Sequence, residues 1–127
     1  MKSTPLSLLI ITSLLLCAAS KCSDKTADKR ILSKIDFDLT NVSDEGMIDG
    51  ITALDYEFCI PKDETKVNEV KAIIPDVNMP RMAKGRIRCS EDEWLCIVSS
   101  SGPDWKKDLY AIASLPYVKK IVATYYE

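Results

Sequence analysis

RIRCSEDEWLCIVS, residues 86–99, is the stretch that decides the fold expected for this chain. Residues 86–89 alternate polar and apolar side chains, which is typical of a strand with one buried face. Residues 94–98 are continuously apolar, as a more central strand can be. Between them lie residues 90–93, which are polar and turn-prone. The stretch therefore predicts a β-hairpin.

Two cysteines lie at opposed positions of this expected hairpin. With residues 92–93 in the turn, Cys89 faces Cys96. Directly opposed residues at a non-hydrogen-bonded position have Cα atoms about 4.5 Å apart, within the disulfide range of roughly 4.4–6.8 Å. We therefore expect a Cys89–Cys96 disulfide across the hairpin and Cys22–Cys59 as the second pair. A Cys59–Cys96 bond between neighbouring strands is the alternative.

The other roles that cysteines commonly take fit this sequence less well. The chain contains no histidine, and the spacing between Cys89 and Cys96 lacks the tight two-to-four-residue loop of structural zinc sites. There is no C-x-x-C dithiol of the thioredoxin kind. We therefore expect no metal site, no cofactor and no catalytic set that depends on histidine.

The first 20 residues have the layout of a secretory signal peptide. Lys2 supplies a positive charge, residues 6–16 form a short apolar run, and residues 18–20 are small enough for cleavage after Ser20. The apolar run is shorter than the roughly 20 residues that span a bilayer. We therefore expect export to the periplasm or the extracellular space, where the four cysteines left after loss of Cys17 form two disulfides.

A membrane-anchored lipoprotein of structural role is the alternative, because Cys17 and Cys22 both lie near the right place for acylation. Lipid attachment normally requires a small residue directly before the cysteine. Leu16 precedes Cys17 and Lys21 precedes Cys22. Neither position fits, so a lipid anchor is the less favoured interpretation.

Length and charge narrow the class of protein further. Removal of 20 of the 127 residues leaves one domain's worth of chain, enough for a modest core. The formal net charge is −2, which argues against nucleic-acid binding because such binding requires a basic face. No second long apolar run follows the first 20 residues, so we expect no transmembrane segment in the mature chain.

Residues 21–50 are expected to form an N-terminal extension. Residues 34–40, KIDFDLT, alternate apolar and polar side chains with a period of two, which predicts a short accessory strand. Residues 41–50 are dense in turn-forming side chains and mark the start of the main domain, residues 51–127.

Regular patterns continue through the main domain on both sides of the hairpin. They predict strands at 51–61 and 117–127, a helix between Asp63 and Pro75, and a helix between Trp105 and Pro116. The order β-α-β-β-α-β predicts an α+β ferredoxin-like two-layer sandwich, with two helices on one face of a four-stranded antiparallel sheet. Right-handed crossovers place the first and third strands at the centre.

Two carboxylates lie on the sheet face that the helices leave open. Asp55 and Glu57 share this face because side chains alternate along a strand. Paired carboxylates serve as general acid and base only when a cleft separates their pKa values. Solvated strand charges are the commoner explanation, so a carboxylate-dependent hydrolase is the least favoured function.

A basic cluster follows the first predicted helix. Arg81, Arg86 and Arg88 are suited to a carboxylate-rich or phosphate-bearing partner, although charges that protect an edge strand produce the same pattern. Tyr126 is a further candidate because tyrosine is a favoured binding anchor. These residues and the loop from 75 to 84 are the best candidates for a partner-binding surface.

The serine-rich run at residues 99–102 and the two tryptophans are expected to be structural. The run lacks the glycine spacing and the lysine of a phosphate loop, so we interpret it as the cap of the second helix. Trp94 and Trp105 are expected to anchor the core.

No nucleophile with an adjacent base is visible in the sequence. We therefore expect a small exported, disulfide-bonded binding protein that acts through its surface without catalysis. The roles that fit are an inhibitor, an immunity-type protector or an accessory subunit of an envelope complex, and the expected partner is another protein.

Overall fold

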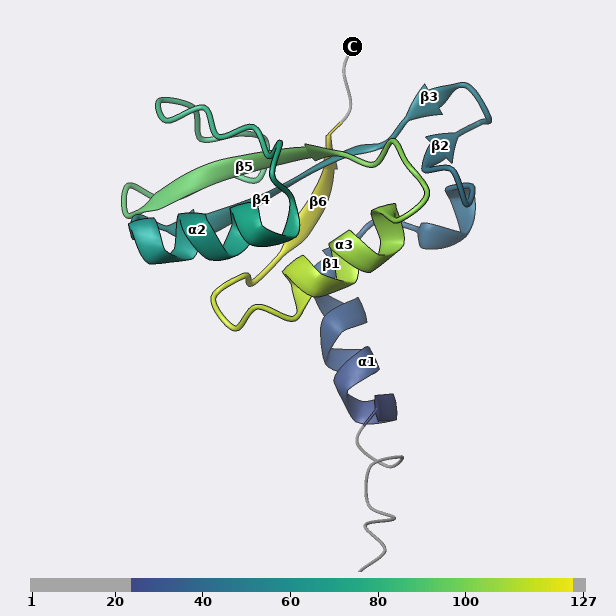
Figure 1. The fold of residues 1–127 in the computed structure, drawn as a ribbon, viewed down its shortest axis with the longest axis horizontal. Coiled ribbons are helices and arrows are strands. Elements are labelled where there is room, and N and C mark those ends of the chain that lie inside the picture. The colour runs from purple at the N-terminus through teal and green to yellow at the C-terminus, as the bar shows by residue number, and fades with distance from the viewer. Residues whose placement is uncertain (1–23, 125–127) are drawn as a thin grey trace, which may run out of the picture.

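The computed structural model describes residues 24–124, with side chains from residue 29 onward (Figure 1). Its elements in chain order are α1 (Asp24–Lys34), β1 (Ile35–Asp36), the 3-10 helix η2 (Leu39–Asn41), β2 (Met47–Ile48), β3 (Thr52–Ala53), β4 (Asp55–Pro61), α2 (Glu64–Ile73), β5 (Glu93–Ser99), α3 (Trp105–Ala113) and β6 (Ile121–Thr124). The predicted α+β class is confirmed. The expected signal peptide, residues 1–20, and the lipid-anchor candidates Cys17 and Cys22 lie outside the described residues.

One four-stranded sheet, with strand order β1-β6-β4-β5, organises the fold. Strand β4 lies between β5 and β6 and is antiparallel to both. Strand β1 adds to the other edge of β6 and runs parallel to it. Strands β2 and β3 form a separate antiparallel hairpin. The main sheet is therefore mixed.

The ferredoxin-like arrangement is wrong in its strand order and in its purely antiparallel pairing. The predicted strand at 86–89 is not formed, because residues 85–88 make a turn in which Gly85 and Arg88 both have positive φ. Backbone in that region cannot continue a pleated ladder. Strand β5 therefore lies at an edge rather than at the centre, and the fourth strand, Ile35–Asp36, comes from the extension.

The core lies between the sheet and the helices α2 and α3. Tyr56, Phe58 and Ile60 project from one face of β4 and are fully buried, as the period of a strand requires. Both predicted helices are formed, and their buried faces pack on these residues through Val67, Val70, Trp105, Leu109, Ile112 and Ala113.

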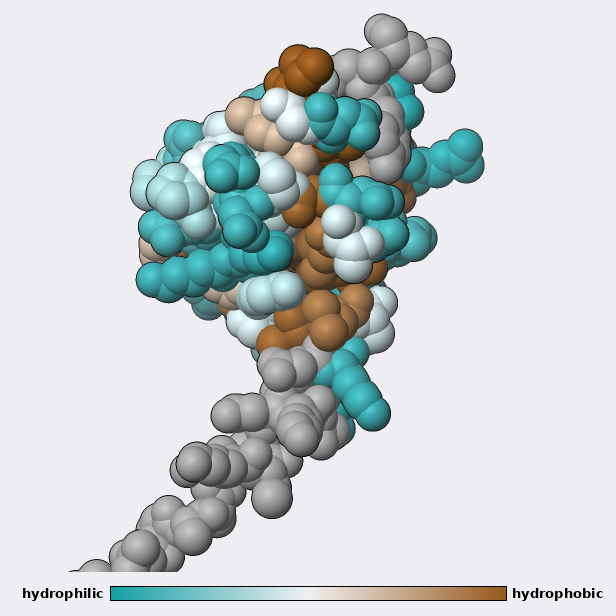
Figure 2. Space-filling view, turned by 90° about the vertical axis from the view of Figure 1, so that its right-hand side faces the viewer, coloured by the Kyte–Doolittle hydropathy of each residue, from teal (hydrophilic) through white to brown (hydrophobic). Residues whose placement is uncertain are grey.

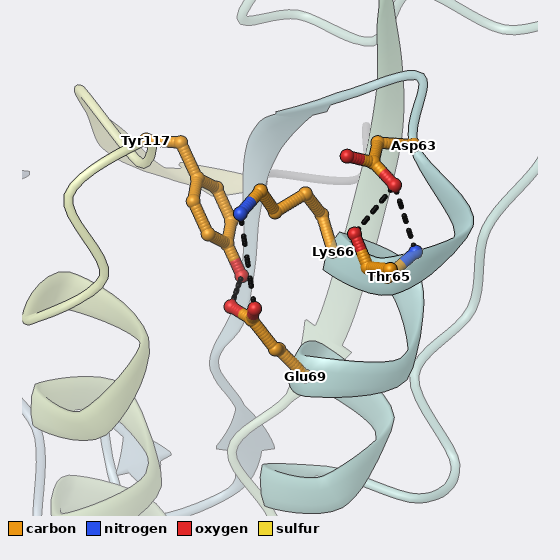
Figure 3. Close-up of polar contacts among 5 residues, drawn as sticks. All are labelled: Asp63, Thr65, Lys66, Glu69 and Tyr117. Carbon is orange, nitrogen blue, oxygen red and sulfur yellow. Dashed lines mark hydrogen bonds and ion pairs between the residues drawn. The ribbon is translucent and has the colours of Figure 1, made fainter.

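Helix α2 begins at the predicted N-cap, Asp63 (Figure 3). The Asp63 carboxylate accepts hydrogen bonds from the hydroxyl and the backbone N–H of Thr65, and these bonds lower the pKa of Asp63. Further along the helix, the Tyr117 hydroxyl donates to Glu69 at 2.8 Å, and the Lys66 ammonium lies 5.0 Å from the centre of the Tyr117 ring. These contacts tie α2 to the segment before β6.

Apolar side chains before β4 extend the core to one side of the molecule. Ile35, Leu39 and Ile48 are half-buried and pack against the core, and the Phe37 ring stacks on Tyr56 with 6.5 Å between ring centres. Figure 2 shows the side on which β2 and β3 lie, where a band of apolar residues runs between hydrophilic ones. Residues 35–48 therefore pack as part of the same core.

The serine run before α3 has a different role from the predicted cap. The N-cap of α3 is Asp104, whose side chain makes no capping hydrogen bond. Ser100 is fully buried, and its hydroxyl is directed at the carbonyl oxygens of Gly46 and Leu54. The capping interpretation is therefore wrong, because Ser100 joins the segment before β2 to the end of β5.

Candidate functional site

The connection between α2 and β5 carries the basic residues that the sequence singles out. We define residues 80–92 as the anchored loop. Its cationic side chains are all exposed: Arg81, Lys84, Arg86 and Arg88. Just before the loop, Asn78 and Ile97 exchange two backbone hydrogen bonds of 3.0 and 2.8 Å, which fixes where the loop leaves the sheet edge.

A disulfide bonds the anchored loop to the sheet. Cys59 in β4 and Cys89 are joined, with their Cα atoms 5.6 Å apart. The predicted Cys89–Cys96 bond is therefore wrong, and so are the Cys22–Cys59 pair and the Cys59–Cys96 alternative. A disulfide at this position is consistent with an oxidising compartment.

Side-chain alternation explains why Cys96 is not part of this bond. The β4–β5 register pairs Phe58 with Cys96 and Cys59 with Leu95. Cys96 therefore shares the core face with Phe58, whereas Cys59 lies on the opposite face of the sheet. Cys96 is fully buried, and burial raises the pKa of its thiol to about 12. A thiol in this environment is chemically inert.

Glu57 lies beneath the anchored loop and is only 2% exposed. Its Oε1 accepts a hydrogen bond from the Ile87 backbone N–H at 2.6 Å, and its Oε2 accepts one from the Thr124 hydroxyl at 3.1 Å. The prediction that Glu57 is a solvated strand charge is therefore wrong. Asp55, on the same face, is half-buried. Both Glu57 oxygens thus accept a hydrogen bond from another segment, and the residue holds the loop against the sheet.

Gly85 allows the loop to approach the sheet closely. It has a φ of +70°, and a Cβ at this position would lie 2.6 Å from Cδ1 of Leu95 and 2.9 Å from Oε1 of Glu57. Arg88 follows with a φ of 61°, which is uncommon for a residue other than glycine. The close approach thus requires a residue without a side chain at position 85.

Replacing Glu57 with alanine is expected to lower the free energy of unfolding by about 1–3 kcal/mol, because the Ile87 N–H would lose its acceptor in a part-buried site. Glu57→Gln is the matched control. Its amide oxygen can still accept from Ile87 and its NH2 group can donate to Thr124, so most of the stability should remain. Urea titration of the three proteins measures the difference. Equal midpoints for the alanine and glutamine variants would contradict the anchoring role.

At the start of the anchored loop, Arg81 contacts side chains of β5 and α2. The Arg81 guanidinium lies 3.8 Å from the centre of the Trp94 ring and 3.7 Å from a carboxylate oxygen of Glu64. Trp105 is a buried core residue, as predicted, whereas Trp94 is half-buried and also serves as the stacking surface for Arg81. Arg81 is therefore engaged within the molecule.

Met82, Arg86 and Arg88 of the anchored loop face solvent. Met82 is 97% exposed, and Arg86 is exposed beside the turn. Arg88 lines a hollow of about 190 Å³ together with Lys119 and Lys120, next to the disulfide. Of the predicted contact residues, Arg86 and Arg88 thus lie free on one loop, and Tyr126 lies outside the described residues. The exposure of Met82 was not apparent from the sequence.

Two further findings concern the described part of the chain, residues 24–124. None of its helices has both the length and the apolar character needed to cross a membrane. No three or more His, Cys, Asp or Glu side chains in it form a group that could hold a metal ion.

Comparison with protein-family models, curated proteins and solved structures finds no match to this chain.

Proposed function

We propose that this chain is a small exported protein that binds another protein through the anchored loop and has no catalytic role. The observation that carries the proposal is the attachment of the loop. A segment without regular structure displays cations while the Cys59–Cys89 bond and the Glu57–Ile87 hydrogen bond hold it against the sheet. A loop held in one shape before binding loses less conformational entropy when its partner binds.

The exposed groups of the loop favour an acidic partner with an apolar recess. The guanidinium groups of Arg86 and Arg88 can each form two parallel hydrogen bonds to a carboxylate. Met82 is a flexible apolar side chain, well suited to an irregular recess on a partner. An inhibitor, an immunity-type protector and an envelope accessory subunit would all use such a surface. The disulfide and the signal-peptide layout support an exported location.

Charge reversal in the loop tests this proposal. Arg86→Glu is expected to weaken binding to the partner by about tenfold or more, because it replaces an attraction by a repulsion across the interface. The partner is first captured from the native envelope or medium with the tagged mature protein, and its affinity is then measured by calorimetry.

Lys107→Glu on α3 is the matched control, because it also reverses one exposed cation but leaves the loop intact. It should bind as the unaltered protein does. Equal loss of affinity in both variants would show that the partner responds only to net charge. No loss in either would place the interface elsewhere.

A further inference from the structure

A hollow of about 250 Å³ lies where α2 ends, β5 ends and α3 begins. Three carboxylates line it: Asp76, Asp104 and Asp108. The apolar part of its wall includes Ile74 and Val98. No lysine or arginine lines it, and no hydrogen bond or ion pair within residues 29–124 engages any of the three carboxylates.

Tyr56 also lines this hollow, and its hydroxyl has no hydrogen-bond partner although the side chain is fully buried. Buried tyrosine hydroxyls usually have a partner. Burial and, secondarily, the negative charge of Asp108 raise the pKa of Tyr56, which keeps the hydroxyl protonated. An unsatisfied polar group therefore lies at the same place as the free carboxylates.

Charge decides which kind of ligand this hollow attracts. The N-terminus of α3 contributes a positive end equivalent to about half an elementary charge. The three carboxylates carry three negative charges and outweigh it. Asp104 occupies the N-cap position but makes no capping bond, so its carboxylate remains available. A cation is attracted here and an anion is repelled.

We propose that this hollow binds an organic cation that ends in a guanidinium or primary ammonium group. The N–H donors of the cation contact Asp76, Asp104 and Asp108, which line the hollow together with Tyr56, the residue of the unpartnered hydroxyl. The alkyl stem lies against the apolar wall. A volume of about 250 Å³ is below the roughly 300–1,000 Å³ of drug-sized sites, so the ligand is about as large as one amino-acid side chain. Within residues 24–124, these three carboxylates do not form a group that could hold a metal ion.

Titration of the mature protein with N-butylguanidinium, followed by NMR, tests the site. We expect saturable shifts of the amide signals of residues 98–108 and none with N-butylurea, a neutral molecule of the same shape. Asp108→Asn and Asp76→Asn should each weaken binding about fivefold or more. Asp92→Asn in the anchored loop should leave it unchanged. Equal binding of the charged and neutral ligands, or unaltered affinity in both hollow variants, would overturn the proposal.

A second ligand pair completes the test, and one of the two hollow variants guards against misfolding of the other. Asp76 is exposed and outside any helix or strand, so Asp76→Asn provides the comparison even if Asp108→Asn fails to fold. Acetyl-arginine amide, with acetyl-citrulline amide as its neutral counterpart, identifies the source of the cation. Tighter binding of acetyl-arginine amide than of N-butylguanidinium assigns the hollow to a peptide side chain, and weaker binding assigns it to a free small amine or guanidine. Either ranking supports the site, which does not depend on the role of the anchored loop.

Discussion

Removing the Cys59–Cys89 disulfide by replacing both cysteines with alanine is expected to lower the free energy of unfolding by about 3–4 kcal/mol. The two cysteines are 30 residues apart in the sequence, and closing a loop of that length restricts the unfolded chain by about this amount in the chain-entropy model. Single domains are stable by only about 5–15 kcal/mol. The melting temperature, followed by circular dichroism, should therefore fall by more than about 10 °C.

Cys96→Ala is the control for this experiment, because it removes a buried cysteine and leaves the disulfide intact. We expect a smaller loss, of about 1 kcal/mol, from the cavity that remains. Peptide mass mapping of the unaltered protein should recover a linked pair containing Cys59 and Cys89. A Cys89–Cys96 linkage, or a Cys96→Ala variant as unstable as the double variant, would contradict the structure.

The long periodic segments of this fold could be predicted from the sequence. The helix that follows Asp63 and the helix that begins at Trp105 are both present. In each, several apolar residues at helical spacing and a cap or proline at the ends indicate the same helix. The prediction of a strand at residues 86–89 was wrong because four residues of alternating polarity also occur in loops that bury part of their side chains. Only the backbone at Gly85 and Arg88, which has positive φ, distinguishes the two.

The cysteine pairing failed for a related reason. Without a strand at residues 86–89, Cys89 does not face Cys96 across a hairpin. Cys59 alternates in phase with Asp55 and Glu57, so it belongs to the open face of its strand, but the sequence could not show that a loop folds over that face. The same missing information concealed the burial of Glu57, whose partner Ile87 lies 30 residues away.

The basic loop was recognisable from its composition, whereas the acidic hollow was not. Arg86 and Arg88 lie close together in the sequence, so their shared location required no tertiary information. The hollow combines Asp76, Asp108 and Tyr56, which come from three separate segments. Tyr56 shares one face of its strand with Phe58 and Ile60, which is the pattern of an ordinary core residue. Only the structure shows that its hydroxyl is unpaired.

Gly46→Ala is expected to lower the free energy of unfolding by about 2–5 kcal/mol. Gly46 has a φ of +79°, and a Cβ there would lie 1.8 Å from the carbonyl oxygen of Ser100. The left-handed backbone alone disfavours alanine by about 1–2 kcal/mol, and forcing an extra carbon into a packed contact adds about 1–3 kcal/mol. The Gly46 carbonyl also accepts hydrogen bonds from the Leu54 N–H and the Ser100 hydroxyl, so movement of the segment disturbs both bonds.

Comparison with Gly50→Ala separates two causes of the expected loss of stability in Gly46→Ala, the steric clash of the new Cβ and the unfavourable backbone conformation. Gly50 has a similar φ of +73°, but nothing lies within 4 Å of its Cβ position. Alanine there should lower the free energy of unfolding by only about 1–2 kcal/mol, which is the backbone effect alone. Urea titration of both variants therefore measures how firmly the segment before β2 packs against the end of β5. Equal losses would contradict this packing, since the two glycines differ in their surroundings and hardly in their backbone conformation.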